Sequence, residues 1–148
     1  MQQALVRSAG VDDLEEVIRL LQHLHPDEAP PVPAKAQATW LAMLDSGLVT
    51  VLVAEVGGCL ASSCTLCIVP NLTHAARPFG VIENVVTHSD YRRRGLGHAV
   101  LAAALDTAWA ADCYKVMLAT GSQRPETLRF YERAGFKRGR TAFQARRL

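Results

Sequence analysis

The stretch that decides the fold reads Ile82-Glu83-Asn84-Val85-Val86-Thr87-His88-Ser89-Asp90-Tyr91-Arg92-Arg93-Arg94-Gly95-Leu96-Gly97-His98-Ala99. Residues 82–87 are typical of a strand, and the two glycines open an alanine-rich segment with helical spacing. At such a junction the first backbone N–H groups of the helix have no intrahelical acceptor, and the helix dipole adds positive charge. Glycine leaves those groups accessible, and the adjacent arginines are cationic. The junction therefore predicts a binding site for a pyrophosphate.

Two better-known phosphate motifs do not fit this junction. A Walker A loop requires Gly-Lys-Ser/Thr, which does not occur in the sequence. A dinucleotide-binding fingerprint requires a third glycine where Val100 stands. A surface loop with solvated arginines remains the alternative to an anion site.

The residues on either side of the junction indicate one α/β (α+β) domain over residues 1–148. The Gly57-Gly58 pair predicts a tight hairpin turn. Apolar periodicity and turn residues predict strands over 2–8, 48–56, 59–69, 80–87 and 114–119. They predict helices over 14–24, 34–44, 95–111 and 125–134. A loop is expected over 70–78 and strand pieces over 136–146. A hairpin followed by strand–helix–strand predicts a mixed sheet with at least one parallel crossover.

Charge is distributed unevenly along the 148 residues, although the formal net charge is only +2. Residues 1–76 hold three basic and eight acidic residues, whereas residues 77–148 hold 13 basic and six acidic ones. A basic half in one small domain indicates an anionic partner. With 49% hydrophobic and 20% charged residues, the composition excludes disordered, collagen-like and coiled-coil chains.

No metal site and no membrane segment are expected. Cys64 and Cys67 have the spacing of zinc ligands, but they fall in a predicted strand, where positions three apart face opposite sides. Residues 56–76 lack charge but are broken by glycine, serine and proline. Residues 1–7 lack the features of a signal peptide, and buried thiols fit a reducing compartment, so we expect a cytoplasmic protein.

Two motifs resemble those of the GNAT N-acetyltransferase superfamily. Arg92-x-x-Gly95-x-Gly97 is similar to the family's Arg/Gln-x-x-Gly-x-Gly/Ala signature, and Phe130-Tyr131-x-x-x-Gly135-Phe136 resembles its Phe-Tyr-x-x-x-Gly-Phe motif. The order of predicted elements also matches over essentially the whole chain. The resemblance implies a central mixed, mostly antiparallel sheet with a splayed parallel strand pair and flanking helices. It further implies N-acetyltransferase activity with acetyl-CoA as co-substrate.

The same resemblance assigns cofactor-binding residues. The backbone of Val85, Val86 and Thr87 would pair with the pantetheine arm, and the Val85 N–H would polarise the thioester carbonyl. The pyrophosphate would be held by successive backbone N–H groups, those of Arg92, Arg93, Arg94, Gly95, Leu96, Gly97 and His98. Three positions depart from the family pattern, Thr87, Ser89 and Thr127.

Two side chains are candidates for proton transfer. Glu83, the acid on the strand leading into the junction, matches the family's catalytic glutamate and could accept the proton of the attacking amine. Tyr131 could return a proton to the leaving thiolate. The alternatives are a surface ion pair for Glu83 and a core aromatic role for Tyr131.

The acceptor amine is expected to bind beside the first helical pair. Four polar residues lie in the first helical pair and its loop, namely His23, His25, Asp27 and Glu28, while Asn84 and His88 flank the site. The sequence also resembles glucosamine-6-phosphate and aminoalkylphosphonate acetylases, whose anionic group Arg124 or the C-terminal arginines could bind. A homodimer is also possible within the resemblance.

The primary hypothesis is direct acetyl transfer to a small-molecule amine in a ternary complex. The alternatives are an idle acetyl-CoA-binding sensor, which would not need Glu83 or Tyr131, and a protein N-acetyltransferase. Nucleic-acid binding is not expected, because aromatic residues make up only 6% of the chain and stand mostly at core-like positions.

Overall fold

The computed structural model describes residues 2–147. The chain divides into two compact units, Met1–Leu118 and Ala119–Leu148. The first unit holds the entire sheet with the helices that cover it, and the second holds helix α5 (Pro125–Arg133). The single domain expected over residues 1–148 stays a prediction.

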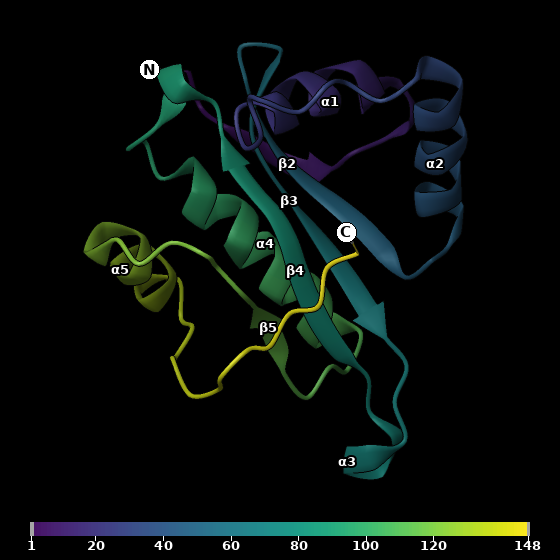
Figure 1. Cartoon of the computed structure of the whole chain (residues 1–148), viewed down its shortest axis with the longest axis vertical. Helices are drawn as coiled ribbons and strands as arrows, with labels where there is room; N and C mark the ends of the chain where they lie inside the picture. Colours follow the sequence, from purple (N-terminus) through teal and green to yellow (C-terminus); the bar gives the residue numbers. More distant parts are fainter. Residues whose placement is uncertain (1, 148) are drawn as a thin grey trace. The chain divides into compact units, whose positions relative to one another are not determined.

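The first unit is built on a mixed five-stranded sheet in which the strands lie side by side in sequence order (Figure 1). The strands are β1 (Leu5–Ser8), β2 (Val49–Val56), β3 (Cys59–Val69), β4 (Phe79–Thr87) and β5 (Val116–Leu118). The pairs from β1 to β4 are antiparallel, while β4 and β5 are parallel. The predicted mixed, mostly antiparallel sheet is confirmed.

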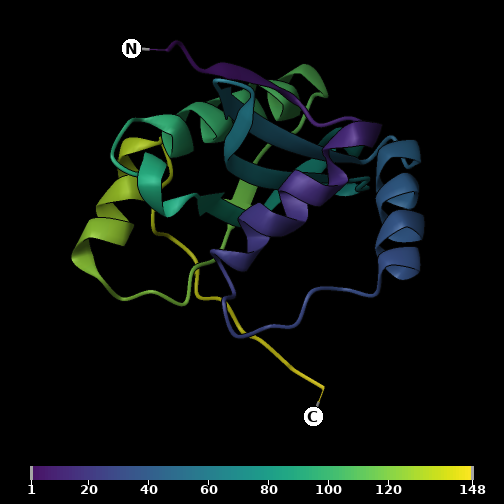
Figure 2. The ribbon, with the colours of Figure 1, turned by 90° about the horizontal axis from the view of Figure 1, so that it is seen from above.

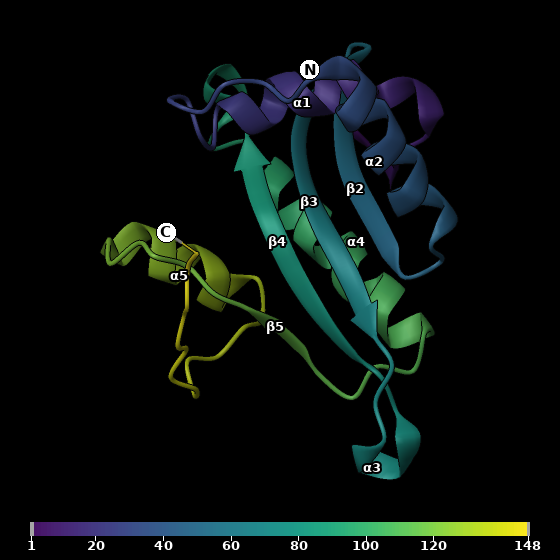
Figure 3. The ribbon, with the colours of Figure 1, turned by 45° about the vertical axis from the view of Figure 1, so that its right-hand side comes forward.

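Helices cover both faces of this sheet (Figures 2 and 3). Helices α1 (Leu14–Gln22) and α2 (Pro33–Asp45) lie on one face, here called the α1 face, and α4 (Leu96–Ala110) lies on the other, the α4 face. Val17 and Leu20 of α1 and Trp40 of α2 are buried with strand residues on the α1 face. Small alanines at 104 and 108 are fully buried, which lets α4 lie close to the sheet.

A β-bulge in β4 changes which face its side chains occupy. Ser63 pairs with Val86 and Thr65 pairs with Glu83, so three steps along β4 match two along β3. Asn84 within this bulge has a φ of 54°, a left-handed conformation that asparagine tolerates better than most residues. Residues opposite each other in neighbouring strands share a face, and Ser63 and Thr65 lie on one face of β3 because they are two positions apart. Their partners Val86 and Glu83 therefore share a face, which is the α1 face because Val86 packs with residues of α1.

The face reversal is visible in the core packing. The Cys64 thiol donates to the Val100 carbonyl on α4 at 3.5 Å, so Cys64 and its strand neighbour Leu66 face α4. Ile82 pairs with Leu66 and therefore lies on the α4 face, although Val86 packs with α1. Ile82 and Val86 are four positions apart, so in a regular strand, where side chains alternate, both would lie on the same face.

Two sequence predictions are corrected by the structure. The strand pieces expected over 136–146 are absent from the described residues, where this segment has neither helix nor strand. Basic residues dominate it and Phe143 is 94% exposed, so it has little apolar surface to bury. The loop expected over 70–78 contains a short left-handed turn, α3 (Thr73–Ala76), which the Asn71 amide stabilises by donating to the carbonyls of Thr73 and Arg77.

A three-residue ion network joins β1 to the start of the first helical segment, η1 (Val11–Asp13). The Arg7 guanidinium donates to both carboxylate oxygens of Asp13 at 2.7 and 2.9 Å, and to Glu55 on β2 at 3.0 and 3.1 Å. The Arg7 hydrogen bonds lower the pKa of Asp13 below its usual value of 3.8, and the Gly10 N–H adds to the effect. The network fixes the chain entering α1 against the sheet.

We expect Asp13→Asn to lower the free energy of unfolding by about 1–2 kcal/mol at pH 7, because charge-assisted bidentate hydrogen bonds are lost. Because the folded-state pKa of Asp13 is lowered, this stabilisation is fully present above the unfolded-state pKa and is lost as the pH falls through the folded-state pKa. The variant and the wild type should therefore converge only at a pH below that lowered pKa. Urea unfolding measures both values. Glu15→Gln, which removes an exposed pair with Arg19 at 3.6 Å, serves as the control. Equal losses for the two variants would contradict the assignment.

Candidate active site

The parallel strand pair separates partway along β4. Strand β5 pairs only with Gly80, Val81 and Ile82, whereas β4 continues to Thr87. In the described chain, the β4 edge from residue 83 to residue 87 therefore has no strand partner on the β5 side. An unpaired edge of this kind offers backbone N–H and C=O groups to an extended ligand. It corresponds to the splayed pair that the sequence predicts.

A tight turn follows this edge and leads into α4. Arg93 has a φ of 60° and Gly95 a φ of 77°, and left-handed residues in a turn are typical of backbone segments whose N–H groups bind anions. Gly95 is the N-cap of α4 and provides no side-chain cap, so the amides of Leu96 and Gly97 have no intrahelical acceptor. We call residues 92–98 the anion loop. It coincides with the segment for which the sequence predicts a pyrophosphate site, and that role stays a prediction.

The arginines of the anion loop are exposed and partly fixed. The Arg92 Nε donates to the Thr87 carbonyl at 3.3 Å, and the Arg94 Nη2 donates to the Asp90 carbonyl at 3.0 Å. The Arg94 guanidinium also lies 5.1 Å from the centre of the Tyr91 ring. Each guanidinium has five donors, so most of them stay available to phosphate oxygens.

Two histidines connect this region to the end of α1. The rings of His23 and His88 are 4.1 Å apart, and the His88 Nδ1 accepts the Asp90 N–H at 3.1 Å, which places the His88 proton on Nε2 in the neutral ring. Burial lowers the pKa of His23, and the nearby His88 and Arg92 lower it further. Sequence reasoning assigned His23 to the acceptor wall and did not find this contact, because the two residues are far apart in the chain.

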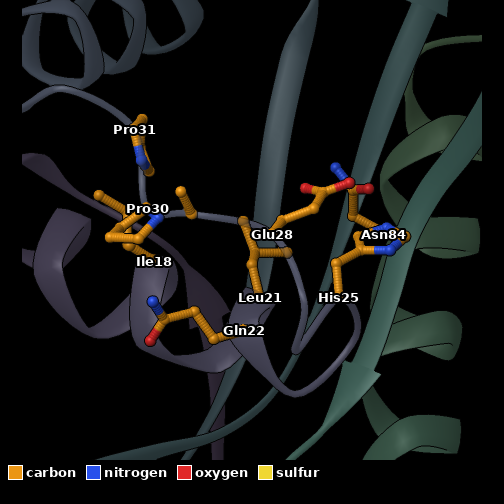
Figure 4. A pocket seen from close by; sticks show the side chains of 9 residues that line it. Ile18, Leu21, Gln22, His25, Glu28, Pro30, Pro31 and Asn84 are labelled. Carbon is orange, nitrogen blue, oxygen red and sulfur yellow. The ribbon is translucent and has the colours of Figure 1, made fainter.

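A pocket of about 300 Å³ lies on the α1 face, beside the β4 bulge (Figure 4). It is lined by Ile18, Leu21, Gln22, His25, Glu28, Ala29, Pro30, Pro31 and Asn84. Of the residues that the sequence predicted for the acceptor, His25, Glu28 and Asn84 therefore come together. Asp27 is not among the lining residues, and the aliphatic and proline residues were not predicted.

Glu83 is exposed on the α1 face, next to the pocket residue Asn84. Among the described residues, none of the ion pairs or side-chain hydrogen bonds includes Glu83. The alternative of a surface ion pair is thus not what the structure contains. The carboxylate is available to accept a proton.

Tyr131 lies in the second unit, where it is half-buried on α5. Its ring contacts Phe130 and Phe136 edge-on, with centres 5.0 and 6.4 Å away. Gly135 ends the helix with a φ of 99°, as the motif predicts. Arg124, at the N-cap of α5, is paired with Glu126 at 2.6 Å. The catalytic role of Tyr131 stays a prediction.

The described residues contain no cluster of three or more potential metal ligands. Cys64 is buried, and burial raises its thiol pKa to about 12, so this thiol stays protonated at neutral pH. In the part of the chain that the structure describes, no helix combines the length and apolar character needed to cross a bilayer.

Comparison with known proteins shows which family shares these features. Residues 14–136 match the acetyltransferase (GNAT) family. The chain belongs to this family. A curated glucosamine 6-phosphate N-acetyltransferase of Trypanosoma brucei brucei is 35% identical over 127 residues, which cover 84% of this chain and 83% of that protein. This GNAT chain is therefore an acetyl-CoA-dependent N-acetyltransferase, as its two motifs predict.

Solved structures agree with this GNAT assignment. A structure from Agrobacterium tumefaciens str. C58, with the provisional description of an acetyltransferase, is 44% identical with a TM-score of 0.92 and covers 97% of this chain and 99% of its own. An acetyltransferase of Trypanosoma brucei is 29% identical with a TM-score of 0.83, and the match covers 97% of this chain and 99% of that chain. The predicted GNAT fold is confirmed.

The structure tests whether the GNAT co-substrate fits these residues. The open β4 edge can pair with an extended amide-containing arm, and the anion loop combines outward amides with three cationic side chains. Apart from Gly95 itself and its neighbours in the chain, no atom lies within 4 Å of where a Cβ at Gly95 would stand, so there is open space on that side of the loop. Both halves of acetyl-CoA thus have a chemically matching surface in the first unit.

We expect Gly95→Ala to raise the Kd of CoA about five- to thirtyfold, because a left-handed alanine costs about 1–2 kcal/mol and relaxes by moving the loop amides. Isothermal titration calorimetry measures the Kd. Gly47→Ala is the matched control, since Gly47 has a φ of +67°, equally open surroundings and a place outside the anion loop. Unchanged CoA affinity in Gly95→Ala would show that the loop amides do not hold the cofactor.

Proposed function

We propose that this protein acetylates the primary amine of a small molecule, which attacks acetyl-CoA directly in a ternary complex. The observation that carries the proposal is the geometry of β4. One strand provides the unpaired edge, leads into the anion loop and, through its bulge, brings Glu83 and Asn84 to the pocket side of the sheet.

Acetyl-CoA supplies an activated acetyl thioester. In the proposal, the backbone of Val85, Val86 and Thr87 holds its pantetheine arm, and the amides of residues 92–98 hold its pyrophosphate. The Thr87 hydroxyl is directed inward, since it bonds Ser62 at 2.9 Å while the Ser62 hydroxyl donates to the Val86 carbonyl. Thr87 therefore contributes its backbone and not its side chain to cofactor binding. The Val85 N–H is the proposed donor to the thioester carbonyl.

Glu83 is proposed as the general base. An alkylammonium has a pKa near that of lysine, about 10.4, and cannot attack until it loses a proton. The exposed, unpaired Glu83 carboxylate can accept that proton directly or through one water. It directly precedes the pocket residue Asn84 on β4, the strand proposed to hold the cofactor, whereas Glu28 lines the pocket from the loop after α1.

Tyr131 is proposed as the proton donor to the leaving thiolate. A tyrosine phenol can donate its proton to a thiolate that forms next to it. The motif that includes it, from Phe130 to Phe136, supports this role by resemblance.

A small-molecule acceptor is favoured over a protein because the pocket is small and bounded on one side by the proline-rich loop. The Trypanosoma brucei brucei relative acts on glucosamine 6-phosphate. An aminosugar is therefore one candidate acceptor, and a protein lysine is the second. The cytoplasmic location and the homodimer stay predictions.

Glu83→Gln should lower kcat/KM for the amine about 100-fold near pH 7, because general-base catalysis of proton removal is lost. The deficit should narrow as the pH approaches the amine pKa, where free amine no longer needs a base. Thiol release from acetyl-CoA, followed between pH 6.5 and about pH 9.5, measures the effect. Glu15→Gln, at an exposed site on α1, is the control. A pH-independent deficit would assign Glu83 to amine binding, and CoA binding without turnover of any amine would favour the sensor alternative.

Tyr131→Phe should lower kcat about ten- to 100-fold while leaving the Kd of acetyl-CoA within twofold, since only a proton donor is removed. Stopped-flow kinetics and calorimetry give the two values. Tyr114→Phe is the control, because Tyr114 stacks on His74 at 3.8 Å, outside the candidate site. Parallel losses of kcat and cofactor affinity would place Tyr131 in a structural role.

A further inference from the structure

The pocket on the α1 face has two chemically different ends. At the β4 end, Glu28, His25 and Asn84 gather beside the bulge, while Ile18, Pro30 and Pro31 lie at the opposite end (Figure 4). We propose that the acceptor is a primary amine carried on an apolar, unphosphorylated body, with its amine at the β4 end. This inference rests on the proposed function and adds the class of substrate.

The polar end suits an ammonium group. Glu28 offers a carboxylate, and Asn84 offers an amide oxygen from the bulge itself. Glu83, the proposed base, precedes Asn84 directly on β4 and faces the same side of the sheet. A bound ammonium here would be oriented by acceptors and lie next to the group that removes its proton. The lining thus places the reacting end of the acceptor at β4.

The other end suits an apolar body. Ile18 and Leu21, on one side of α1, form its helical wall, and the loop prolines Pro30 and Pro31 form the facing wall. Gln22 also lies at this end in Figure 4, where its amide is a polar group beside Ile18 and Pro30. Burying an aliphatic or aromatic group against these side chains yields roughly 25 cal/mol per Å² of apolar surface, whereas sugar hydroxyls would lose hydrogen bonds to water.

A phosphate does not suit either end. The lining residues include one carboxylate, Glu28, and neither lysine nor arginine. A phosphate monoester carries about −1.5 to −2 charges and is usually bound by arginine, lysine or a helix N-terminus. In this pocket its available donors would be His25, Gln22 and Asn84, beside the Glu28 carboxylate and with no lysine or arginine to balance its charge. A pocket that binds glucosamine 6-phosphate is expected to offer a cationic side chain to the phosphate, and the lining of this pocket includes no lysine or arginine.

The volume limits the size of the apolar body. About 300 Å³ lies at the lower limit of pockets that take small ligands. A single ring with a short aminoalkyl arm is of this scale, so 2-phenylethylamine is a suitable probe. Glucosamine and glucosamine 6-phosphate are suitable comparison amines, since they differ from each other only by the phosphate.

The test measures kcat/KM for these three amines at saturating acetyl-CoA. We expect 2-phenylethylamine to exceed glucosamine about tenfold, and glucosamine to exceed its 6-phosphate. A kcat/KM for 2-phenylethylamine equal to or below that of either sugar, or turnover confined to a lysine peptide, would overturn the substrate class while leaving acetyl transfer intact. Saturation-transfer NMR of 2-phenylethylamine with CoA present gives a second readout. Binding of 2-phenylethylamine with no turnover of any of the three amines would support the pocket assignment and refute the proposed function, whereas absence of its binding would overturn the substrate class alone.

Charge-introducing variants test the pocket itself. Ile18→Lys puts a cation at the apolar end, so we expect the ratio of kcat/KM for 2-phenylethylamine to that for glucosamine 6-phosphate to fall about 100-fold. Val11→Lys makes the same kind of change at a site that is 58% exposed and not among the lining residues, and should leave the ratio within about twofold. Pro31→Lys repeats the test from the exposed loop in case the α1 variant fails to fold. An unchanged ratio in folded Ile18→Lys or Pro31→Lys would refute the assignment.

Discussion

The extra residue in β4 is the constraint on which the site depends. A regular strand would keep Ile82 and Val86 on one face, and one of them would then lose its place in the core. The bulge lets Ile82 pack against the α4 face and Val86 against α1 within five residues. The polar residues between them are directed to the pocket side as a consequence. Packing on both faces of the sheet thus fixes where the carboxylate of Glu83 stands.

The uneven charge of the sequence corresponds to two regions of the first unit. The acidic N-terminal half supplies α1 and the loop with Glu28, which border the pocket. The basic half supplies the anion loop at the end of β4. An amine cation and a polyanionic cofactor would each approach a region of opposite charge. Both regions meet at one strand, which is where acetyl transfer requires the two substrates to meet.

Much of this arrangement follows from the sequence because it depends on local signals. The helices, the hairpin at Gly57-Gly58 and the anion loop come from periodicity and from glycines at positive φ. The bulge at Asn84 does not, because asparagine in a strand pattern gives no sign of which strand it will oppose. The sequence did not predict the apolar wall of the pocket, because Ile18 and Leu21 belong to the apolar stripe of α1 that is expected to pack against the sheet.

Other failures have a tertiary origin. The strand expected near the C-terminus had too little apolar surface to bury, although its local sequence permitted extended structure. The contact between His23 and His88 joins residues from separate elements, which no periodicity reports. Such contacts depend on how α1 crosses the sheet and become visible only once the register of β3 and β4 is known.

That histidine contact has a thermodynamic consequence. His88 is tied through the Asp90 N–H to the turn that precedes the anion loop, and His23 caps α1 two residues before the pocket residue His25. A displacement at either end therefore acts on the same pair of rings. Any free energy that one substrate spends on moving this pair is added to or removed from the binding of the other, by an equal amount in both directions. Through this contact, the turn before the anion loop is connected to the segment after α1 that lines the pocket.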